Sequence, residues 1–263
     1  MKVVTLTGGT RGIGYGLADS FLALGCSVTI SGRNQKNVDE AAATLAAKHG
    51  ADRVLGRACD VTQCDQVQNL WDAAKARFGR VDIWINNAGI SLPQSSVCEL
   101  PPDQIKAIVE TNTLGAMYGA RVAIKGMREQ GYGAVYNMEG LGSDGRKIEG
   151  LIPYGTTKYA LAYLTDALAQ EVKGTPVIVG AIRPGMVITD LITAQYKDRP
   201  AEEWADARRI FNILADRVET VTPWIAQKVL DNRKNGARIN WLSPIKVMGR
   251  FLTARFRKRD LFD

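Results

Sequence analysis

Tyr154 and Lys158 stand four positions apart in a stretch, residues 153–172, whose pattern predicts a helix. At this spacing both side chains lie on the same face of a helix, so a phenol and an ammonium group become neighbours. A cation beside a tyrosine favours the phenolate and lowers the pKa of the phenol toward neutrality, where it can give or take a proton. Alone, the pair is also compatible with coincidence, because eight tyrosines give many chances of a lysine at this spacing.

A glycine-rich segment, residues 7–14, has the sequence Thr-Gly-Gly-Thr-Arg-Gly-Ile-Gly. It follows residues 3–6, an apolar run that predicts a buried strand, and precedes an amphipathic run over residues 15–24 that predicts a helix. Such a turn lets the backbone approach a pyrophosphate closely, with free N–H groups of the helix start facing its charge. The spacing T-G-x-x-x-G-x-G differs from the dinucleotide fingerprint G-x-G-x-x-G, so an ordinary tight turn is the alternative. Its position at the first strand–helix junction favours a nucleotide site.

The same alternation continues along the chain and predicts the fold. Further strands are predicted over residues 27–30, 53–58, 81–85, 134–138, 177–182 and 239–242, and further helices over residues 37–48, 62–78 with Thr62 as the N-cap, 102–130 and 153–172. This order predicts an α/β fold with a single Rossmann-type doubly wound parallel sheet, helices on both faces and one domain over residues 1–263. Ligands of such sheets bind beyond the carboxyl ends of the strands, so the loops 139–152 and 186–213 are candidates for substrate walls.

Composition excludes several classes of protein. The chain has 263 residues, of which 46% are hydrophobic, enough for one substantial core. It has no apolar run of 18 residues, so no transmembrane helix is expected, and the strand that follows Met1-Lys2 leaves no room for a signal peptide. The four cysteines lack C-x-x-C spacing and His49 is the only histidine. We therefore expect no metal site, no histidine-based triad and a reduced, cytoplasmic compartment.

Several motifs, taken in order, resemble the short-chain dehydrogenase/reductase family over essentially the whole chain. They are Thr7-Gly8-x3-Gly12-Ile13-Gly14, Asn86-Asn87-Ala88-Gly89, Asn112, Tyr154-x3-Lys158 and Pro184-Gly185. The resemblance implies that Tyr154 is the general acid/base, that Lys158 lowers its pKa and holds the nicotinamide ribose, and that Asn112 anchors a water in a proton relay. By itself the segment 86–89 would predict only a turn after a strand.

The same resemblance implies a nicotinamide cofactor bound across the ends of several strands. Residues 87–89 would line the adenosine and ribose, and Thr189 would bond the carboxamide. The residues expected to bind the cofactor are Gly8, Thr10, Arg11, Gly12, Ile13, Gly14, Ser31, Arg33, Asn34, Asp60, Val61, Asn87, Ala88, Gly89, Tyr154, Lys158, Pro184, Gly185, Val187 and Thr189.

Charge at the end of the second strand predicts that the cofactor is NADP(H). An NAD site places Asp or Glu there to hold the ribose 2′-hydroxyl. Here the strand ends in Ile30-Ser31-Gly32-Arg33-Asn34, and no carboxylate follows until Asp39. Arg33 and Arg11 supply cations where a 2′-phosphate would sit, and guanidinium groups bind phosphate in bidentate fashion. The alternative is that Arg33 only solvates a loop.

Gly140 marks a departure from the family pattern. The family serine that polarises the substrate carbonyl aligns with this position, in the sequence Asn137-Met138-Glu139-Gly140-Leu141-Gly142-Ser143. Ser143 is the nearest hydroxyl and is expected to take the role of the missing serine, because Gly140, Gly142 and Gly145 allow a tight inward bend. Glu139 is the other polar candidate.

That departure, together with segments 82–89, 111–115, 137–146 and 184–191, resembles the chlorophyll(ide) b reductase subgroup. The resemblance implies that NADPH reduces the C7 formyl of chlorophyll b to a hydroxymethyl. One alternative is a short-chain reductase of another aldehyde, ketone or alcohol. Because the serine is missing, a catalytically weak NADP(H)-binding sensor or scaffold is an alternative of a different class.

A net charge of +7 is concentrated near the carboxyl end of the chain, in the tail 246–263. Basic residues interleaved with Phe251, Leu252 and Phe256 suit peripheral contact with anionic lipid, and a solvated tail is the alternative. Nothing here resembles a nucleic-acid-binding module. The expected partners are a small carbonyl compound, with a tetrapyrrole as one candidate, and further copies of the chain.

Overall fold

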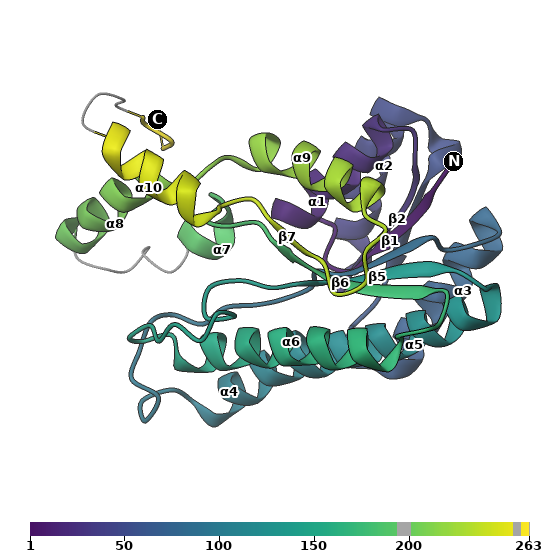
Figure 1. Cartoon of the computed structure of the whole chain (residues 1–263), viewed down its shortest axis with the longest axis horizontal. Coiled ribbons are helices and arrows are strands. Elements are labelled where there is room, and N and C mark those ends of the chain that lie inside the picture. The colour runs from purple at the N-terminus through teal and green to yellow at the C-terminus, as the bar shows by residue number, and fades with distance from the viewer. Residues whose placement is uncertain (194–200, 255–258, 263) are drawn as a thin grey trace.

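One parallel sheet organises the protein, whose computed structural model describes residues 1–193, 201–254 and 259–262. Its seven strands lie in the order β3-β2-β1-β4-β5-β6-β7 and all pair in parallel. They are β1 (Val3–Leu6), β2 (Ser27–Gly32), β3 (Val54–Ala58), β4 (Ile83–Asn86), β5 (Gly133–Met138), β6 (Val177–Arg183) and β7 (Arg238–Asn240). The predicted doubly wound α/β fold is confirmed (Figure 1). The strand order reverses between β1 and β4, the place where such sheets bind ligands.

Helices cover both faces of this sheet (Figure 1). One face carries α1 (Gly12–Ala23), α2 (Gln35–His49) and α9 (Val218–Asp231), and the other carries α3 (Cys64–Phe78), α4 (Pro102–Val109), α5 (Gly115–Gln130) and α6 (Ile152–Glu171). A short 3₁₀ turn, η1 (Ala51–Arg53), precedes β3. All four residues of β1 are buried, because α1 contacts this strand on one face of the sheet and α3 on the other. Within the described residues, no helix is long and apolar enough to cross a bilayer.

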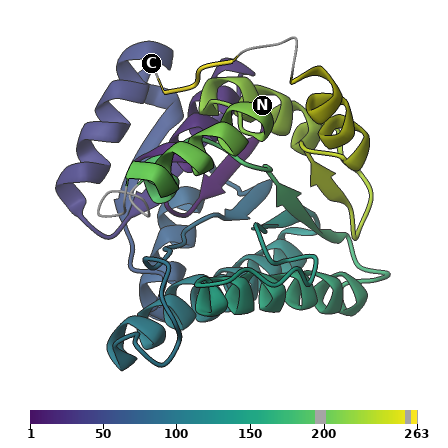
Figure 2. The ribbon, with the colours of Figure 1, turned by 90° about the vertical axis from the view of Figure 1, so that its left-hand side faces the viewer.

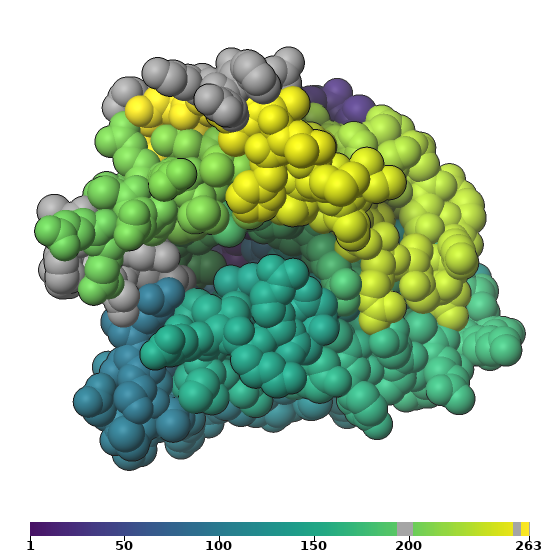
Figure 3. Space-filling view, turned by 60° about the vertical axis from the view of Figure 1, so that its left-hand side comes forward, coloured from purple at the N-terminus to yellow at the C-terminus, as the bar shows by residue number. Residues whose placement is uncertain are grey.

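Three further helices lie beyond the carboxyl ends of the strands (Figure 1). They are α7 (Asp190–Thr193), α8 (Ala201–Leu214) and α10 (Pro244–Thr253), of which α8 packs on α10. Figure 2 looks onto this end of the sheet. In the space-filling view of Figure 3, a hollow separates the green and yellow segments that hold α8 and α10 from the teal segment below them.

Several predicted boundaries are wrong. The N-cap of α3 is Gln63, not Thr62, because the Thr62 hydroxyl donates to Oδ1 of Asp60 at 2.9 Å. The helix predicted over residues 102–130 is interrupted by a π-helical turn, η2 (Glu110–Leu114), which joins α4 to α5. Helix α9 is absent from the prediction although it buries Val221, Ile225 and Val229 at helical spacing.

The carboxyl-terminal tail is folded where the structure describes it. Ser243 caps α10 by accepting a hydrogen bond from the N–H of Lys246 at 3.3 Å. Arg250 and Arg259 then donate to the buried carboxylate of Asp216 at 2.6 and 2.9 Å. A solvated tail is therefore wrong for these residues, whose cations have a buried partner. Arg255, Phe256, Arg257 and Lys258, which belong to the same prediction, lie outside the described residues.

A buried polar network joins the two central strands to the helices below them. Oδ1 of Asn86 accepts from the indole of Trp84 at 2.7 Å, and its Nδ2 donates to Oδ1 of Asn137 at 2.9 Å. Nδ2 of Asn137 donates in turn to the hydroxyl of Thr165 on α6 at 3.0 Å. Gly119 on α5 makes room for the network, since a Cβ there would lie 1.9 Å from Oδ1 of Asn86. The buried side chains of Trp84, Asn86 and Asn137 therefore all have hydrogen-bond partners, and the cost of an unpaired buried polar group is avoided.

Replacing Gly119 with Ala should destabilise the protein by about 2–4 kcal/mol, because the methyl must displace the Asn86 amide and break its bonds to Trp84 and Asn137. Chemical denaturation of both proteins measures the difference. Gly249→Ala on α10 is the matched control, since a Cβ there meets nothing within 4 Å. A Gly119→Ala variant as stable as Gly249→Ala would contradict the role given to this network.

Candidate active site

The glycine turn after β1 has the backbone that a phosphate group requires. Gly8 and Gly12 have φ of +66° and +56°, a region that disfavours other residues. A Cβ at Gly14 would lie 2.1 Å from the carbonyl oxygen of Gly8, so the turn closes only with glycine there. The N-cap of α1 is Arg11, whose side chain makes no capping bond. The N–H groups at the start of α1 are therefore free to bind an anion, and the turn fits the pyrophosphate of a nicotinamide dinucleotide.

Asn87 fixes this turn to the end of β4. Its Nδ2 donates to the carbonyl oxygens of Thr7 and Gly8, both at 2.9 Å. In return the hydroxyl of Thr7 accepts from the N–H groups of Asn87 and Ala88 at 3.1 and 3.0 Å. The side chain predicted to line the adenosine is thus used inside the protein, where it holds the ends of β1 and β4 together.

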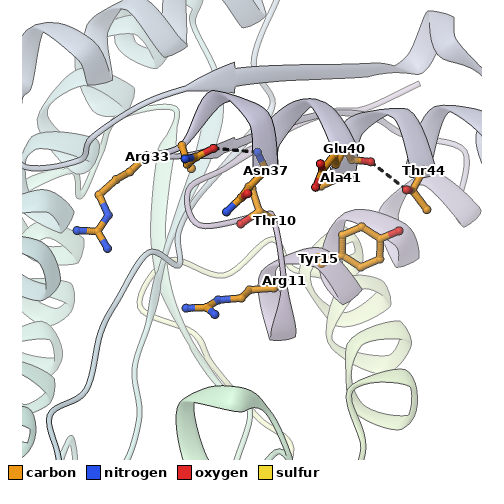
Figure 4. Close-up of a pocket in the computed structure, with 10 residues that line it drawn as sticks. Thr10, Arg11, Tyr15, Arg33, Asn37, Glu40, Ala41 and Thr44 are labelled. Carbon is orange, nitrogen blue, oxygen red and sulfur yellow. Dashed lines mark hydrogen bonds between the residues drawn. The ribbon is translucent and has the colours of Figure 1, made fainter. Parts of the chain in front are cut away.

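A pocket of about 500 Å³ lies between the starts of α1 and α2 (Figure 4). Thr10, Arg11, Arg33 and Asn34 line it, and both guanidinium groups extend to the same side. Among the described residues Arg33 has no ion pair. Arg11 lies 3.9 Å from Asp190 with both side chains 79% exposed, a weak pairing. The pocket therefore offers two available cations at the place predicted for a 2′-phosphate.

Other groups around this pocket are polar or structural. The carboxylate of Glu40, which also lines it, lies 3.9 Å from Lys36 on the same helix. Asn34 caps α2 by accepting from the N–H of Asn37 at 3.1 Å. The hydroxyl of Ser31 at the end of β2 is buried and has no hydrogen-bond partner among the described residues. No carboxylate follows β2 directly, in keeping with the sequence.

The remaining residues predicted for the cofactor are spread along the same edge of the sheet. The carboxylate of Asp60 accepts hydrogen bonds from the N–H and the hydroxyl of Thr62, at 3.0 and 2.9 Å. Val61 packs where a Cβ of Gly115 would stand, and Ile13 packs into the core. The structure brings Thr189 beside the glycine turn, since a Cβ at Gly12 would lie 3.4 Å from Cγ2 of Thr189.

Residues 184–189, the segment that carries Thr189, are fixed by contacts with Leu242 and Asp216. Pro184 follows β6, and Gly185 has a φ of +73° and no room for a Cβ beside Leu242. Val187 is buried and pairs with Asp216 in an isolated bridge. The ends of the loop predicted as a substrate wall over residues 186–213 are thus fixed to the body, while residues 194–200 lie outside the described part of the chain.

Tyr154 and Lys158 lie together in the first turns of α6. Lys158 is 5% exposed, its Nζ donates to the carbonyl oxygen of Met138 at 2.9 Å, and it lies 5.6 Å from the centroid of the Tyr154 ring. Burial lowers the pKa of Lys158 to about 8, opposed by the charge of Glu139, and burial raises the pKa of Tyr154 to about 12. In the protein alone the pKa of Tyr154 is therefore raised, not lowered toward neutrality as the sequence predicted, because burial desolvates the phenol. That Lys158 lowers this pKa stays a prediction.

Asn112 occupies the π-helical turn that interrupts the long helix, a distortion common at functional sites. Its amide oxygen accepts from the N–H of Ile90 at 2.8 Å, and its Nδ2 donates to the Ile90 carbonyl at 2.9 Å and the Thr157 hydroxyl at 3.2 Å. Thr157 donates to the carbonyl oxygen of Tyr154 at 2.8 Å. Asn112 thereby connects the segment after β4 to the turn that carries Tyr154. Its role in holding a water stays a prediction.

Gly140 lies against the phenol, at the position aligned with the family serine. A Cβ on Gly140 would stand 3.0 Å from the Tyr154 hydroxyl and 3.4 Å from Cε of Lys158. A serine there would have touched both groups, so its absence leaves space directly beside the proposed proton donor.

The loop after Gly140 bends back onto α6. Gly142 and Gly145 have φ of +97° and +84°, and a Cβ on Gly142 would lie 2.8 Å from Cα of Gly155. Ser143, which is 6% exposed, closes a turn by donating its N–H to the carbonyl of Gly140 at 3.0 Å. No described residue makes a hydrogen bond with its hydroxyl. That hydroxyl is therefore available to a ligand, which supports the role predicted for Ser143 without testing it.

Glu139, the other candidate for that role, is excluded. Its carboxylate is fully buried, accepts from Nε of Arg183 at 2.5 Å and lies 3.8 Å from Nε of Arg238. An ionised carboxylate has no proton to donate to a carbonyl oxygen. This cluster could not be predicted from the sequence, because Arg183 and Arg238 are distant along the chain and meet Glu139 only through the order of β5, β6 and β7.

Comparisons with known proteins agree with this arrangement. The family described as short chain dehydrogenase matches residues 2–200. The chain is 35% identical over 231 residues to the chloroplastic chlorophyll(ide) b reductase NOL of Oryza sativa subsp. japonica, a match that covers 86% of this chain and 66% of that protein. It is 31% identical over 276 residues to the probable chlorophyll(ide) b reductase NYC1, chloroplastic, of the same species, covering 99% of this chain and 53% of that protein. The chain thus spans between about half and two thirds of the length of these relatives.

One solved structure with a similar fold is that of a variant actinorhodin polyketide ketoreductase with NADPH. It superimposes with a TM-score of 0.81 at 25% identity and covers 91% of this chain and 95% of that one.

Replacing Arg33 with Asp should move cofactor preference from NADPH toward NADH. A carboxylate repels a 2′-phosphate and accepts ribose hydroxyls, and one lost charge-assisted contact changes the ratio of the two dissociation constants by roughly 10- to 150-fold. Titration of both cofactors measures the ratio. Arg128→Asp at the end of α5 changes the net charge equally and should leave the ratio as it is. An unchanged ratio in Arg33→Asp would show that this side chain does not bind the cofactor.

Replacing Ser143 with Ala should lower kcat by about 10²–10³-fold if its hydroxyl donates to the substrate carbonyl. Ser96→Ala, in an exposed loop, is the control and should have no effect. Steady-state rates at saturating cofactor measure both. A loss within about twofold for Ser143→Ala would mean that a backbone N–H fills this role instead.

Proposed function

Because this chain belongs to the short-chain dehydrogenase family and is an oxidoreductase of CH–OH and C=O groups, we propose that it reduces a formyl group with NADPH. The proposed substrate is chlorophyll(ide) b, whose C7 formyl becomes a hydroxymethyl. The observation that carries the proposal is the match to chlorophyll(ide) b reductases combined with a site that has glycine, not serine, beside the Tyr154 hydroxyl.

The choice of NADPH is supported by the charges at the cofactor pocket. Arg33 and Arg11 both extend from its rim, and no carboxylate follows β2 directly. A 2′-phosphate would gain charge-assisted hydrogen bonds there, and the carboxylate that does line the pocket, that of Glu40, lies on α2 at 3.9 Å from Lys36 and not directly after β2. The similarity to a ketoreductase solved with NADPH supports the same choice.

The chemistry proposed for the site needs one hydride and one proton. Bound NADPH supplies the hydride to the formyl carbon. Tyr154 donates its phenolic proton to the developing alkoxide, and solvent later returns a proton to the phenolate. Lys158 stands beside the phenol as an ammonium group and stabilises the phenolate left after proton donation. Its hydrogen bond to the Met138 carbonyl holds it in that position.

The size of the proposed substrate is supported by space at two places. Gly140 leaves the face of Lys158 and Tyr154 without a side chain between them and the ligand. The hollow under α8 and α10 opens at the carboxyl ends of the strands (Figure 3). A rigid tetrapyrrole ring could bring its formyl to the phenol there, because no serine side chain occupies that space.

Two surfaces support proposals about partners. Tyr159 and Tyr163 on α6 are 59% and 76% exposed, and such aromatic residues suit contact with a further copy of the chain.

On α10, Ile245, Met248 and Leu252 share one outward face of an amphipathic helix and are 78%, 60% and 71% exposed. This exposed apolar face supports contact with a lipid surface, where the proposed substrate would partition.

Replacing Tyr154 with Phe should lower the reductase rate by about 10²–10⁴-fold, because only the proton donor is lost. NADPH affinity should stay close to that of the unmodified protein. The rate is measured as NADPH oxidation with chlorophyllide b, and the compound with a methyl at C7 is the control. A Tyr154→Phe protein that keeps more than about a tenth of the activity would contradict the mechanism.

The same assay separates the alternatives. A protein that reduces simple aldehydes or ketones but not the formyl tetrapyrrole is a reductase of another carbonyl compound. A protein that binds NADPH and oxidises it with no member of a carbonyl panel is a sensor or scaffold, the alternative that the missing serine suggests.

A further inference from the structure

The buried carboxylate of Glu139 is not used in the reaction proposed above. Glu139 directly follows β5, and its side chain is fully buried. Nε of Arg183, at the end of β6, donates to Oε2 at 2.5 Å. Nε of Arg238, at the start of β7, lies 3.8 Å from Oε1 but forms no hydrogen bond with it. The carboxylate therefore sits behind the active site with Oε2 hydrogen-bonded to Arg183 and with Oε1 lacking a hydrogen bond from any described residue.

Lys158 is enclosed by the segment that contains this carboxylate. The carbonyl of Met138, the residue before Glu139, accepts the hydrogen bond of Nζ at 2.9 Å. Gly140, the residue after it, faces Cε of Lys158 at 3.4 Å from its Cβ position. Lys158 is itself 5% exposed, so its charge has lost most of its hydration. A cation in such surroundings needs a nearby opposite charge to remain ionised.

The charged and titratable groups around Lys158 come from four elements. Tyr154 is on the same helix, Glu139 ends β5, and Arg183 and Arg238 stand behind Glu139 on β6 and β7. Asp166, farther along α6, binds Nη2 of Arg238 through both oxygens at 2.7 Å. Among these groups Glu139 is the acidic residue whose charge acts on Lys158. The two arginines hold that carboxylate in place and would disfavour the lysine charge if it were absent.

We propose that Glu139 is a positioning residue, whose carboxylate, fixed by Arg183 and Arg238, keeps Lys158 as an ammonium group against the Met138 carbonyl. The inference rests on the proposed function, in which the charge of Lys158 supports proton donation by Tyr154.

The direction of the pH effect follows from the burial of Lys158. Desolvation lowers the pKa of Lys158 to about 8, and the charge of Glu139 raises it. Without that carboxylate the pKa of Lys158 falls further, so the lysine loses its proton at a lower pH. Burial raises the pKa of Tyr154 to about 12, so as pH rises Lys158 titrates before the phenol. The alkaline decline of activity therefore reports on Lys158, and it moves to lower pH when Glu139 is neutralised.

The test compares Glu139→Gln with the unmodified protein over a range of pH. The alkaline decline of kcat should move down by about one pH unit, which gives roughly tenfold lower kcat on the alkaline side and little change at acid pH. Titration of the lysine Cε signal by NMR, assigned with Lys158→Met, should show the same shift without substrate or cofactor. Glu171→Gln is the matched control, because Glu171 is an acidic residue at the end of the same helix that pairs with Arg128 and is 62% exposed. It should leave both curves in place.

Two further variants keep the test decisive if Glu139→Gln fails to fold. Glu139→Asp retains the charge and should restore most of the pH profile. Arg183→Lys retains Glu139 and a cation beside it, so the alkaline decline and the NMR titration should stay close to those of the unmodified protein. A merely structural role for Glu139 would lower activity equally at every pH and leave the titration of Lys158 unmoved. That result would overturn the inference.

Failure of the inference can be told apart from failure of the proposed function. If the unmodified protein reduces the formyl substrate while Lys158 titrates identically in Glu139→Gln, the positioning role is wrong and the function stands. If no carbonyl compound is reduced but the titration shifts as expected, the function is wrong and the electrostatic coupling of Glu139 to Lys158 is supported.

Discussion

Burial of the Lys158 ammonium group is the constraint on which the carboxyl end of the sheet depends. A cation that is 5% exposed must be compensated inside the protein. The Met138 carbonyl and the Glu139 carboxylate do this from the end of β5, and Arg183 and Arg238 balance the carboxylate from the next two strands. Three neighbouring strands, β5, β6 and β7, thus contribute groups that affect the charge of Lys158. Their parallel alignment is what places these groups at the same edge.

The other half of the site, the glycine turn after β1, depends on backbone geometry and not on charged side chains. The N–H groups of the turn after β1 are proposed to bind the cofactor, which requires a backbone without side chains in the way, and glycines provide this at three positions. Asn87 and Ala88 then tie the turn to β4 by four hydrogen bonds to Thr7 and Gly8, three from Asn87 and one from Ala88. The buried network of Asn86 and Asn137 continues the same connection to β5 and α6. Hydrogen bonds across the central strands therefore connect the glycine turn, where the cofactor is proposed to bind, to α6, which carries Lys158.

The glycine at position 140 links this architecture to the choice of substrate. Elsewhere the segment 138–140 is tightly packed around Lys158, yet beside the phenol it leaves a space that a serine would fill. The loop that follows carries Ser143 and bends back onto α6 through two glycines with positive φ. The role proposed for Ser143 would keep a donor available while the space beside Tyr154 stays open to a larger ligand. This separation of the donor from the space beside Tyr154 is consistent with the proposed tetrapyrrole.

The sequence by itself determined the α/β fold, the parallel sheet and the pairing of Tyr154 with Lys158, because periodicity and spacing are local properties of the chain. It also placed Gly140 correctly at the phenol. It did not predict α9 or the folded tail, whose stability comes from packing on α1 and from the buried Asp216. Nor did it predict the sign of the pKa shift of Tyr154 or the partners of Glu139. Desolvation and long-range ion pairs depend on which strands become neighbours, and only the tertiary structure decides that.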